Sequence, residues 1–274
     1  MSFLSKEYLG LEIKRSFKGN MIWSFSLGLS LLLIVAIYPM VEDMMTALTE
    51  MLEYLESQNS PFIAMMEQFG GIPTNAMEYF ATEGAMFMQL LGGIYAAIIG
   101  FGAINKDEKE RTAEVLYVLP ISRSKLLTSK ILSIAFNLFI FTIIQIGLIE
   151  IGFLAVAPDT DHSLILSFGL FDYMMFLMIA YMSLGLAMFM KPNQSSLIAI
   201  AIPFPFYIMT VIASATNNDI LKALKYASPF TFTEPVGWLK SDHVFELANF
   251  LIFTGFTLII LIASYLRYKK RQII

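Results

Sequence analysis

The sequence predicts an all-α integral membrane protein: one domain over residues 1–274, with six transmembrane helices and both termini in the cytoplasm. Three observations support this prediction: the composition, the length of the apolar runs and the distribution of basic residues. Of the 274 residues, 57% are hydrophobic and 15% are charged. A soluble domain has roughly 45–50% apolar and about 25% charged residues, so the composition is typical of a protein embedded in lipid.

Six apolar runs have the length of a membrane span, because a helix needs about 20 mostly apolar residues to cross the hydrocarbon core. Helices satisfy their backbone hydrogen bonds within the segment. Barrel strands would be about ten residues long and would alternate in polarity, and these runs do neither. The six predicted spans are residues 21–40, 84–104, 131–157, 164–190, 195–215 and 247–266.

The basic residues lie almost entirely on one side of these spans. Fifteen of the 18 Lys and Arg fall in residues 1–20, in residues 105–130, at Lys191 and in the C-terminal tail. The other three lie in residues 216–246. Because Lys and Arg accumulate in cytoplasmic loops, we expect a multi-pass plasma membrane protein whose charged loop, residues 105–130, faces the cytoplasm.

Residues 1–20 mix apolar side chains such as Leu11 and Phe17 with basic ones such as Lys14 and Arg15. This pattern favours a short amphipathic helix lying in the membrane interface. An ordinary basic flank that only sets topology explains it about equally well.

Two outer segments are predicted to contain small helices outside the membrane. In residues 41–83, apolar residues recur at helical spacing opposite glutamates and stop at SQNSP, and PFIAMMEQF follows as a second short helix. Residues 216–246 are interpreted as a re-entrant or interfacial helix followed by a loop. Within the fifth span, Pro203 and Pro205 each remove a backbone donor, which predicts a kink or a break there.

Glu150 and Asp172 are the acidic residues inside the predicted spans. Ionisable groups in a membrane are costly and indicate a functional site. Three interpretations of these two carboxyls are open. They could line a water-filled vestibule, they could hydrogen-bond to neighbours such as Gln145 and Asn249, or they could be interfacial groups near helix ends. We favour the last interpretation, with both carboxyls at similar depth in the outer leaflet.

The sequence lacks the motifs of common enzymes and metal sites. It has two histidines, no cysteine, no G-x-S-x-G and no Gly-Lys dipeptide, which excludes a P-loop and argues against a histidine-based metal site. We therefore expect no catalytic residue, no metal and no nucleic-acid partner, and any ATP to be bound by another chain.

The charged loop predicts a rigid structure at the cytoplasmic surface. Glu108, Arg111 and Glu114 recur at helical spacing, and Val115 and Leu116 supply an apolar edge. Pro120 ends this helix, and Ser122 then caps the helix of the third span. A connector that only set topology would need the basic residues but neither the four acids nor the proline corner.

The run EKERTAEVLYVLPISR, followed by Lys130, resembles the signature loop of the type-two ABC transporter permeases. The matching positions are Glu110, Thr112, Glu114, Leu116, Pro120, Ser122, Arg123 and Lys130. ALKYASPFTF, residues 223–232, resembles the Ser-Pro-Phe turn found before the last span of those proteins. Arg111 stands where many members have glycine. With this difference, the loop pattern is most similar to that of the copper-enzyme-maturation and bacitracin-export permeases.

The resemblance implies a permease subunit of an ATP-driven exporter, paired with an identical or homologous permease in the lipid bilayer. Two copies of a separate ATP-binding subunit would hold ATP and Mg²⁺, and residues 106–120 would form the coupling helix. The N-terminal segment resembles the family's interfacial connecting helix. The family mostly exports amphipathic or lipid-linked cargo, peptides and drugs. A secondary carrier and a non-transporting scaffold or sensor remain as alternatives.

Two sets of candidate residues follow from the resemblance and from the intramembrane groups. The ATPase-coupling residues are Glu108, Glu110, Arg111, Thr112, Glu114, Val115, Leu116, Pro120 and Arg123. The candidate residues of a translocation path are Gln145, Glu150, Asp172, Pro203 and Pro205.

Overall fold

The computed structural model describes residues 5–57, 71–110, 121–191, 194–214, 216, 218–239 and 245–270. Every element in these ranges is a helix. Six are long and apolar enough to cross a membrane, which confirms the predicted fold class. Their ranges are Lys6–Met51, Ala76–Asp107, Arg123–Val156, His162–Phe189, Ser196–Ser214 and Leu247–Lys270.

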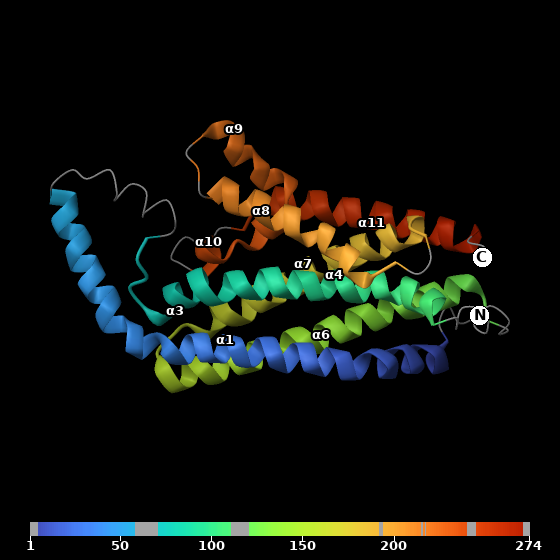
Figure 1. The fold of residues 1–274 in the computed structure, drawn as a ribbon, viewed down its shortest axis with the longest axis horizontal. Coiled ribbons are helices and arrows are strands. Elements are labelled where there is room, and N and C mark those ends of the chain that lie inside the picture. Colours follow the sequence, from blue (N-terminus) through green and yellow to red (C-terminus); the bar gives the residue numbers. More distant parts are fainter. Residues whose placement is uncertain are drawn as a thin grey trace.

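The first helix, α1 (Lys6–Ser57), is a single helix of 52 residues. The structure therefore differs from the separate interfacial helix that we expected for residues 1–20, because the described part of that segment is continuous with the first span. The helix also continues beyond the span into the expected outer segment. Figure 1 shows it bending, and Pro39 is the proline inside it, which bends the helix without ending it. The expected second outer helix, residues 61–69, lies outside the described residues.

Three long helices form the bundle with α1. They are α4 (Met86–Lys109), α6 (Arg123–Val156) and α7 (His162–Phe189), and α4 is preceded by α3 (Ala76–Tyr79) and a π-helical turn, η1 (Phe80–Ala85). Helix α1 packs mainly along α6, and α4 packs mainly along α7, whereas α1 and α4 touch little. The two helix pairs, α1 with α6 and α4 with α7, therefore form the bundle, with little direct packing between α1 and α4.

Small residues bring α4 and α7 into close contact. A Cβ placed on Gly100 would lie 2.0 Å from the carbonyl oxygen of Ala180, so a larger residue would force the two backbones apart. Close approach at small residues is a common way for membrane helices to associate, because lipid gives no hydrophobic drive between them. This contact fixes the position of α4, whose far end leads into the charged loop.

The fifth span is broken, as Pro203 and Pro205 predicted. A 3-10 helix, η2 (Ser196–Ala201), is followed by α8 (Pro203–Ser214), which begins at the first of the two prolines. Proline is well suited to the first position of a helix, because the N–H that it lacks would have no intrahelical partner there. The break therefore costs little backbone hydrogen bonding.

Between α8 and the last span, α11 (Leu247–Lys270), the described residues form four short helices: α9 (Asp219–Lys222), η3 (Ala223–Ala227), η4 (Pro229–Thr233) and α10 (Pro235–Leu239). Phe230 and Phe232 of η4 are fully buried, and η4 packs against α7, α8 and α11. The segment therefore re-enters the bundle instead of lying on its surface.

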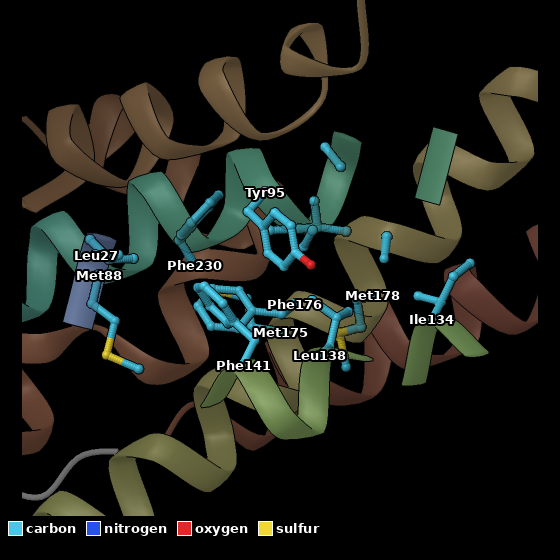
Figure 2. Packing of buried hydrophobic residues seen from close by; sticks show 14 of the residues in the cluster. Leu27, Met88, Tyr95, Ile134, Leu138, Phe141, Met175, Phe176, Met178 and Phe230 are labelled. Atoms are coloured by element: carbon cyan, nitrogen blue, oxygen red, sulfur yellow. The ribbon is translucent and has the colours of Figure 1, made fainter. Parts of the chain in front are cut away.

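Aromatic and sulfur-containing side chains fill the centre of the bundle (Figure 2). Tyr95 of α4 lies 4.8 Å from Phe141 of α6, and Phe141 lies 5.9 Å from Phe176 of α7, measured between ring centroids. The beginning of α1 and the end of α11 lie at one end of the bundle (Figure 1). The last residues of α4 and the first of α6 lie there too, so we call it the basic end.

Candidate functional site

Five charged residues meet at the basic end, and we call them the basal ion-pair cluster: Glu12, Arg15, Asp107, Glu110 and Lys130. The Nζ of Lys130 donates to Glu12 at 2.9 Å and lies 2.5 Å from Asp107. Arg15 pairs with Asp107 and, at 2.6 Å, with Glu110. The cluster therefore alternates in charge from one residue to the next.

The centre of the cluster is buried. The Lys130 side chain is 0% exposed, those of Glu12 and Asp107 are 8% and 6% exposed, and Glu110 is half exposed. Taking a charge out of water costs several kcal/mol, and only well-placed partners compensate for it. Lys130 has two acidic partners and also lies 5.6 Å from the centre of the Tyr8 ring, so its charge is well compensated.

Four members of the cluster lie on helices α1, α4 and α6, and Glu110 directly follows α4. Glu12 and Arg15 lie on α1, Asp107 lies in the last turn of α4, and Lys130 lies in the second turn of α6. The two helices that flank the loop are thus bound to α1 by charge. A displacement of the loop would pull on α1 through these contacts.

A second row of polar contacts joins the same three helices deeper in the bundle. Tyr95 of α4 donates to Asn20 Oδ1 at 2.6 Å, and Asn20 donates to the carbonyl oxygen of Asn137 on α6 at 3.0 Å. Gln145 donates to the carbonyl oxygen of Ser24 at 2.8 Å. Gln145, a candidate for the translocation path, therefore contributes to the contact between α1 and α6.

The structure describes some of the predicted coupling residues. Glu110 belongs to the basal cluster, and Glu108 lies in α4. Arg123 begins α6 and donates to the carbonyl oxygens of Tyr268 and Lys269 in the last turn of α11, each at 3.4 Å. Lying outside the described residues are Arg111, Thr112, Glu114, Val115, Leu116 and Pro120.

Ser122 caps α6, as we predicted. Its hydroxyl accepts a hydrogen bond from the backbone N–H of Lys125 at 3.4 Å, in the usual geometry of an N-cap serine. The helix therefore begins eight residues before the predicted span, at Arg123. This early start brings Lys130 inside the helix, where it can reach α1.

Asp172 is not an interfacial group, so our favoured interpretation of it is wrong. Its side chain is 0% exposed, and its Oδ1 accepts from Gln89 Nε2 at 2.9 Å and from the Thr233 hydroxyl at 3.3 Å. Gln89 also donates to the carbonyl oxygen of Thr233 at 2.6 Å. The re-entrant η4 brings Thr233 to this position, which the sequence of α7 does not indicate. Asp172 therefore ties η4 to α4 and α7.

Glu150 lies near the end of α6, as expected of an interfacial group. Its carboxylate is 2.5 Å from the Nδ1 of His162, which begins α7, and both side chains are partly exposed. The pair closes the short connection between α6 and α7. Glu150 and Asp172 thus differ in environment, although we expected them to be alike.

The break in the fifth span is joined to the Ser-Pro-Phe turn. The Ser228 hydroxyl donates to the carbonyl oxygen of Phe206 and accepts from the Thr210 hydroxyl, both at 2.7 Å. Asn249 of α11 donates to the carbonyl oxygen of Ser228 at 3.0 Å. Pro203 and Pro205 start the helix that carries Phe206, so they help to position this contact.

Within the described residues, no three His, Asp or Glu side chains gather so that they could hold a metal ion. The basal cluster is unsuited to that role, because its carboxylates already face Lys130 and Arg15. Its ion pairs instead hold helices α1, α4 and α6 together.

Glu12, Asp107 and Lys130 are not among the site residues predicted from the sequence, although Lys130 belongs to the loop motif. One signal was present: Glu12 is an acid within a basic, apolar segment. The sequence alone could not pair it with Lys130, which is 118 residues away.

The comparisons with known proteins agree with this architecture. Residues 9–273 match the model of a family described as ABC-2 family transporter protein. No curated protein matches the chain significantly.

Proposed function

Because the chain belongs to the ABC-2 family of transporter proteins, we propose that this permease subunit of an ABC transporter works as an exporter. ATP and Mg²⁺ are held by a separate ATP-binding subunit, present in two copies. A second permease, identical or homologous, completes the path across the plasma membrane. The basic end faces the cytoplasm, because fifteen basic residues gather in the segments at that end.

The observation that supports coupling most directly is the basal ion-pair cluster. It lies at the base of the loop whose sequence resembles a coupling helix, and it binds both flanking helices to α1. A partner that holds this loop differently in two nucleotide states would move three spans together. Energy passes in this way only as far as ATP binds the two states with different affinity.

The class of cargo is inferred from the same family resemblance. An amphipathic peptide, an antimicrobial compound or a lipid-like molecule fits a path through apolar helices. Arg111, in place of the glycine of many members, supports a position near the copper-enzyme-maturation and bacitracin-export permeases.

Purification of the tagged chain from its native host in mild detergent, followed by mass spectrometry, tests the proposal. We expect a stoichiometric partner that contains a P-loop, and a sister permease if the path is a heterodimer. Glu110→Lys should lower recovery of the ATP-binding partner about tenfold or more. The change breaks the pair with Arg15 at the base of the loop and reverses a charge that we propose also faces the partner, where a close charge pair is worth about 1.5 kcal/mol or more. Arg123→Glu should act in the same direction.

Glu246→Lys is the matched control. Glu246 is also a partly exposed glutamate in an ion pair, with Lys225 at 2.8 Å, but it lies just before α11, at the end away from the chain termini. It should leave recovery of the partner unchanged. An intact preparation without any P-loop protein, or equal recovery with Glu110→Lys, would contradict the proposal.

A further inference from the structure

A cleft of about 600 Å³ opens at the basic end, and we call it the basal cleft. Helices α1, α4 and α6 form its walls, and Ser196 of η2 borders it. It exists because α1 and α4 each pack against another long helix and touch each other little. Its volume is within the range of about 300–1,000 Å³ that is usual for sites of small ligands.

The mouth of the cleft has an excess of positive charge. Four basic side chains line the cleft, namely Arg15, Lys106, Lys109 and Lys130, against the two acids Glu12 and Glu110. Within the basal ion-pair cluster, Arg15 and Lys130 face three acids, Glu12, Asp107 and Glu110, so the cluster itself carries one net negative charge. With Lys106 and Lys109 included, one net positive charge remains. Lys106 and Lys109 are exposed, and Lys106 is held only loosely, at 4.0 Å from Glu110. The mouth thus presents two lysines to an anion.

The deep part of the cleft is apolar. Trp23, Ile98, Ile99 and Ile134 line it, and the ring of Trp23 stacks on that of Tyr95, with centroids 5.4 Å apart. The polar groups nearby have partners already, since the Tyr95 hydroxyl donates to Asn20, which donates in turn to Asn137. This part suits an alkyl chain better than a polar solute.

Two glycines keep the cleft open. A Cβ placed on Gly19 of α1 would meet no atom within 4 Å, and one on Gly102 of α4 would meet only the Ser196 hydroxyl oxygen, at 4.0 Å. Both residues line the cleft. Larger side chains at these positions would therefore fill the cleft without displacing the helices.

We propose that the basal cleft binds an amphiphile with an anionic head and a single alkyl chain, taken from the leaflet at the basic end. The head lies against Lys106 and Lys109, and the chain lies along Trp23 and Ile99. This inference rests on the proposed transport function and specifies its cargo class. Positive charge above an apolar pocket selects against cationic amphiphiles, because like charges repel at the mouth.

Trp23 can serve as a fluorescent reporter of binding, because it lines the cleft and is one of two tryptophans in the chain. Trp238→Phe removes the other, which lies in α10. The purified Trp238→Phe protein, in nonionic maltoside micelles, is titrated with dodecyl phosphate while Trp23 fluorescence is recorded. We expect a saturable change, with dodecyltrimethylammonium giving half-saturation at a concentration at least tenfold higher.

Variants then locate the probe. Gly102→Leu, or Gly19→Leu if the first does not fold, should abolish the change by filling the cleft. Gly147→Leu is the matched control, because Gly147 lies exposed on α6 with no atom within 4 Å of an added Cβ. The double variant Lys106→Gln, Lys109→Gln should raise half-saturation about thirtyfold, because each lysine near a charged head contributes about 1 kcal/mol, or about fivefold.

Each outcome of the titration either supports or contradicts the proposed site. An equal response to dodecyltrimethylammonium would overturn the charge preference, and an equal response to inorganic phosphate would reduce the site to one for free anions. An unchanged response in a folded Gly102→Leu or Gly19→Leu protein, or no response at all, would overturn the site. The titration needs no ATP-binding subunit, so its failure is distinct from failure to recover that partner.

Discussion

The basal ion-pair cluster and the carboxyl of Asp172 are both buried, but they are held by different kinds of partner. Lys130 and Arg15 neutralise the acids at the basic end, and the contacts run among three long helices. Among the described residues, Asp172 accepts from the neutral groups of Gln89 and Thr233, and its Oδ2 has no hydrogen-bond partner there. The first arrangement compensates charge with charge, and the second relies on dipoles.

This difference has a mechanical consequence. Coulomb attraction falls slowly with distance, so the basal cluster keeps attracting α1 while the flanking helices shift. A hydrogen bond weakens steeply once its angle or distance departs from the optimum, so the contact of Asp172 with η4 breaks abruptly. We infer that the basal cluster suits transmission of movement, whereas the Asp172 contact suits fixing the re-entrant segment.

The largest effect on stability is expected from Lys130→Met. It removes the cation between Glu12 and Asp107 and leaves Glu12 buried without its positive partner, which typically costs about 3–5 kcal/mol. Unfolding of the purified protein in mixed micelles, followed by circular dichroism as sodium dodecyl sulfate is added, measures the loss.

The double variant Glu12→Gln, Lys130→Gln is the control for that experiment. Asp107 keeps Arg15 as its partner in this variant, so no unpaired charge remains at Glu12. It should be more stable than the single variant Lys130→Gln. Equal or lower stability would show that the cost comes from packing and not from the unpaired carboxylate.

A smaller effect is expected from Asp172→Leu, about 1–3 kcal/mol, because Gln89 and Thr233 lose a buried acceptor. Asp172→Asn should be much closer to wild type, since its amide oxygen can still accept from both. Protease cleavage of the re-entrant segment gives a second readout and should increase in the leucine variant only. If the asparagine variant were as unstable as the leucine variant, the negative charge itself would be required, and the contrast with the basal cluster would fail.

The smallest effect is expected at the partly exposed pair of Lys225 and Glu246. The hydrogen bond from Lys225 to Glu246 raises the pKa of Lys225 above its ordinary value of 10.5. The stabilisation is therefore complete below pH 10.5 and is lost as the pH rises through the higher pKa of the folded protein. Lys225→Gln should lower stability by at most about 1 kcal/mol at pH 8.

Thermal unfolding of wild type and Lys225→Gln at a series of alkaline pH values tests this small contribution of the ion pair to stability. The difference between the two proteins should shrink as the pH rises above 10.5. A difference that stays constant across the series would mean that the lysine acts through its methylene chain and not through its charge.

Much of the architecture could be predicted from the sequence, because the membrane imposes it. The apolar runs had to be helices about 20 residues long, and each of the six appears in the structure. Local chemistry also sufficed for the break at Pro203 and for the cap at Ser122, since both depend on the residue and its near neighbours.

Local patterns failed where an effect came from a neighbouring helix. Asp172 has the sequence context of a group close to a helix end. Its hydrogen-bond partners are nevertheless distant in the chain: Gln89 is separated from it by 83 positions and Thr233 by 61. The helix of residues 1–20 could not be distinguished from an extension of the first span, because an amphipathic pattern does not state where a helix stops.

The sequence by itself thus determined the number of spans, their helical form and the one-sided distribution of basic residues, because each follows from the cost of polar groups in lipid. Only the tertiary structure decided which charges pair, which carboxyl is buried and where a cleft opens. Those features depend on distances between helices far apart in the chain. Packing sets such distances, as where Gly100 lets α4 approach α7 and where the small contact between α1 and α4 leaves the basal cleft open.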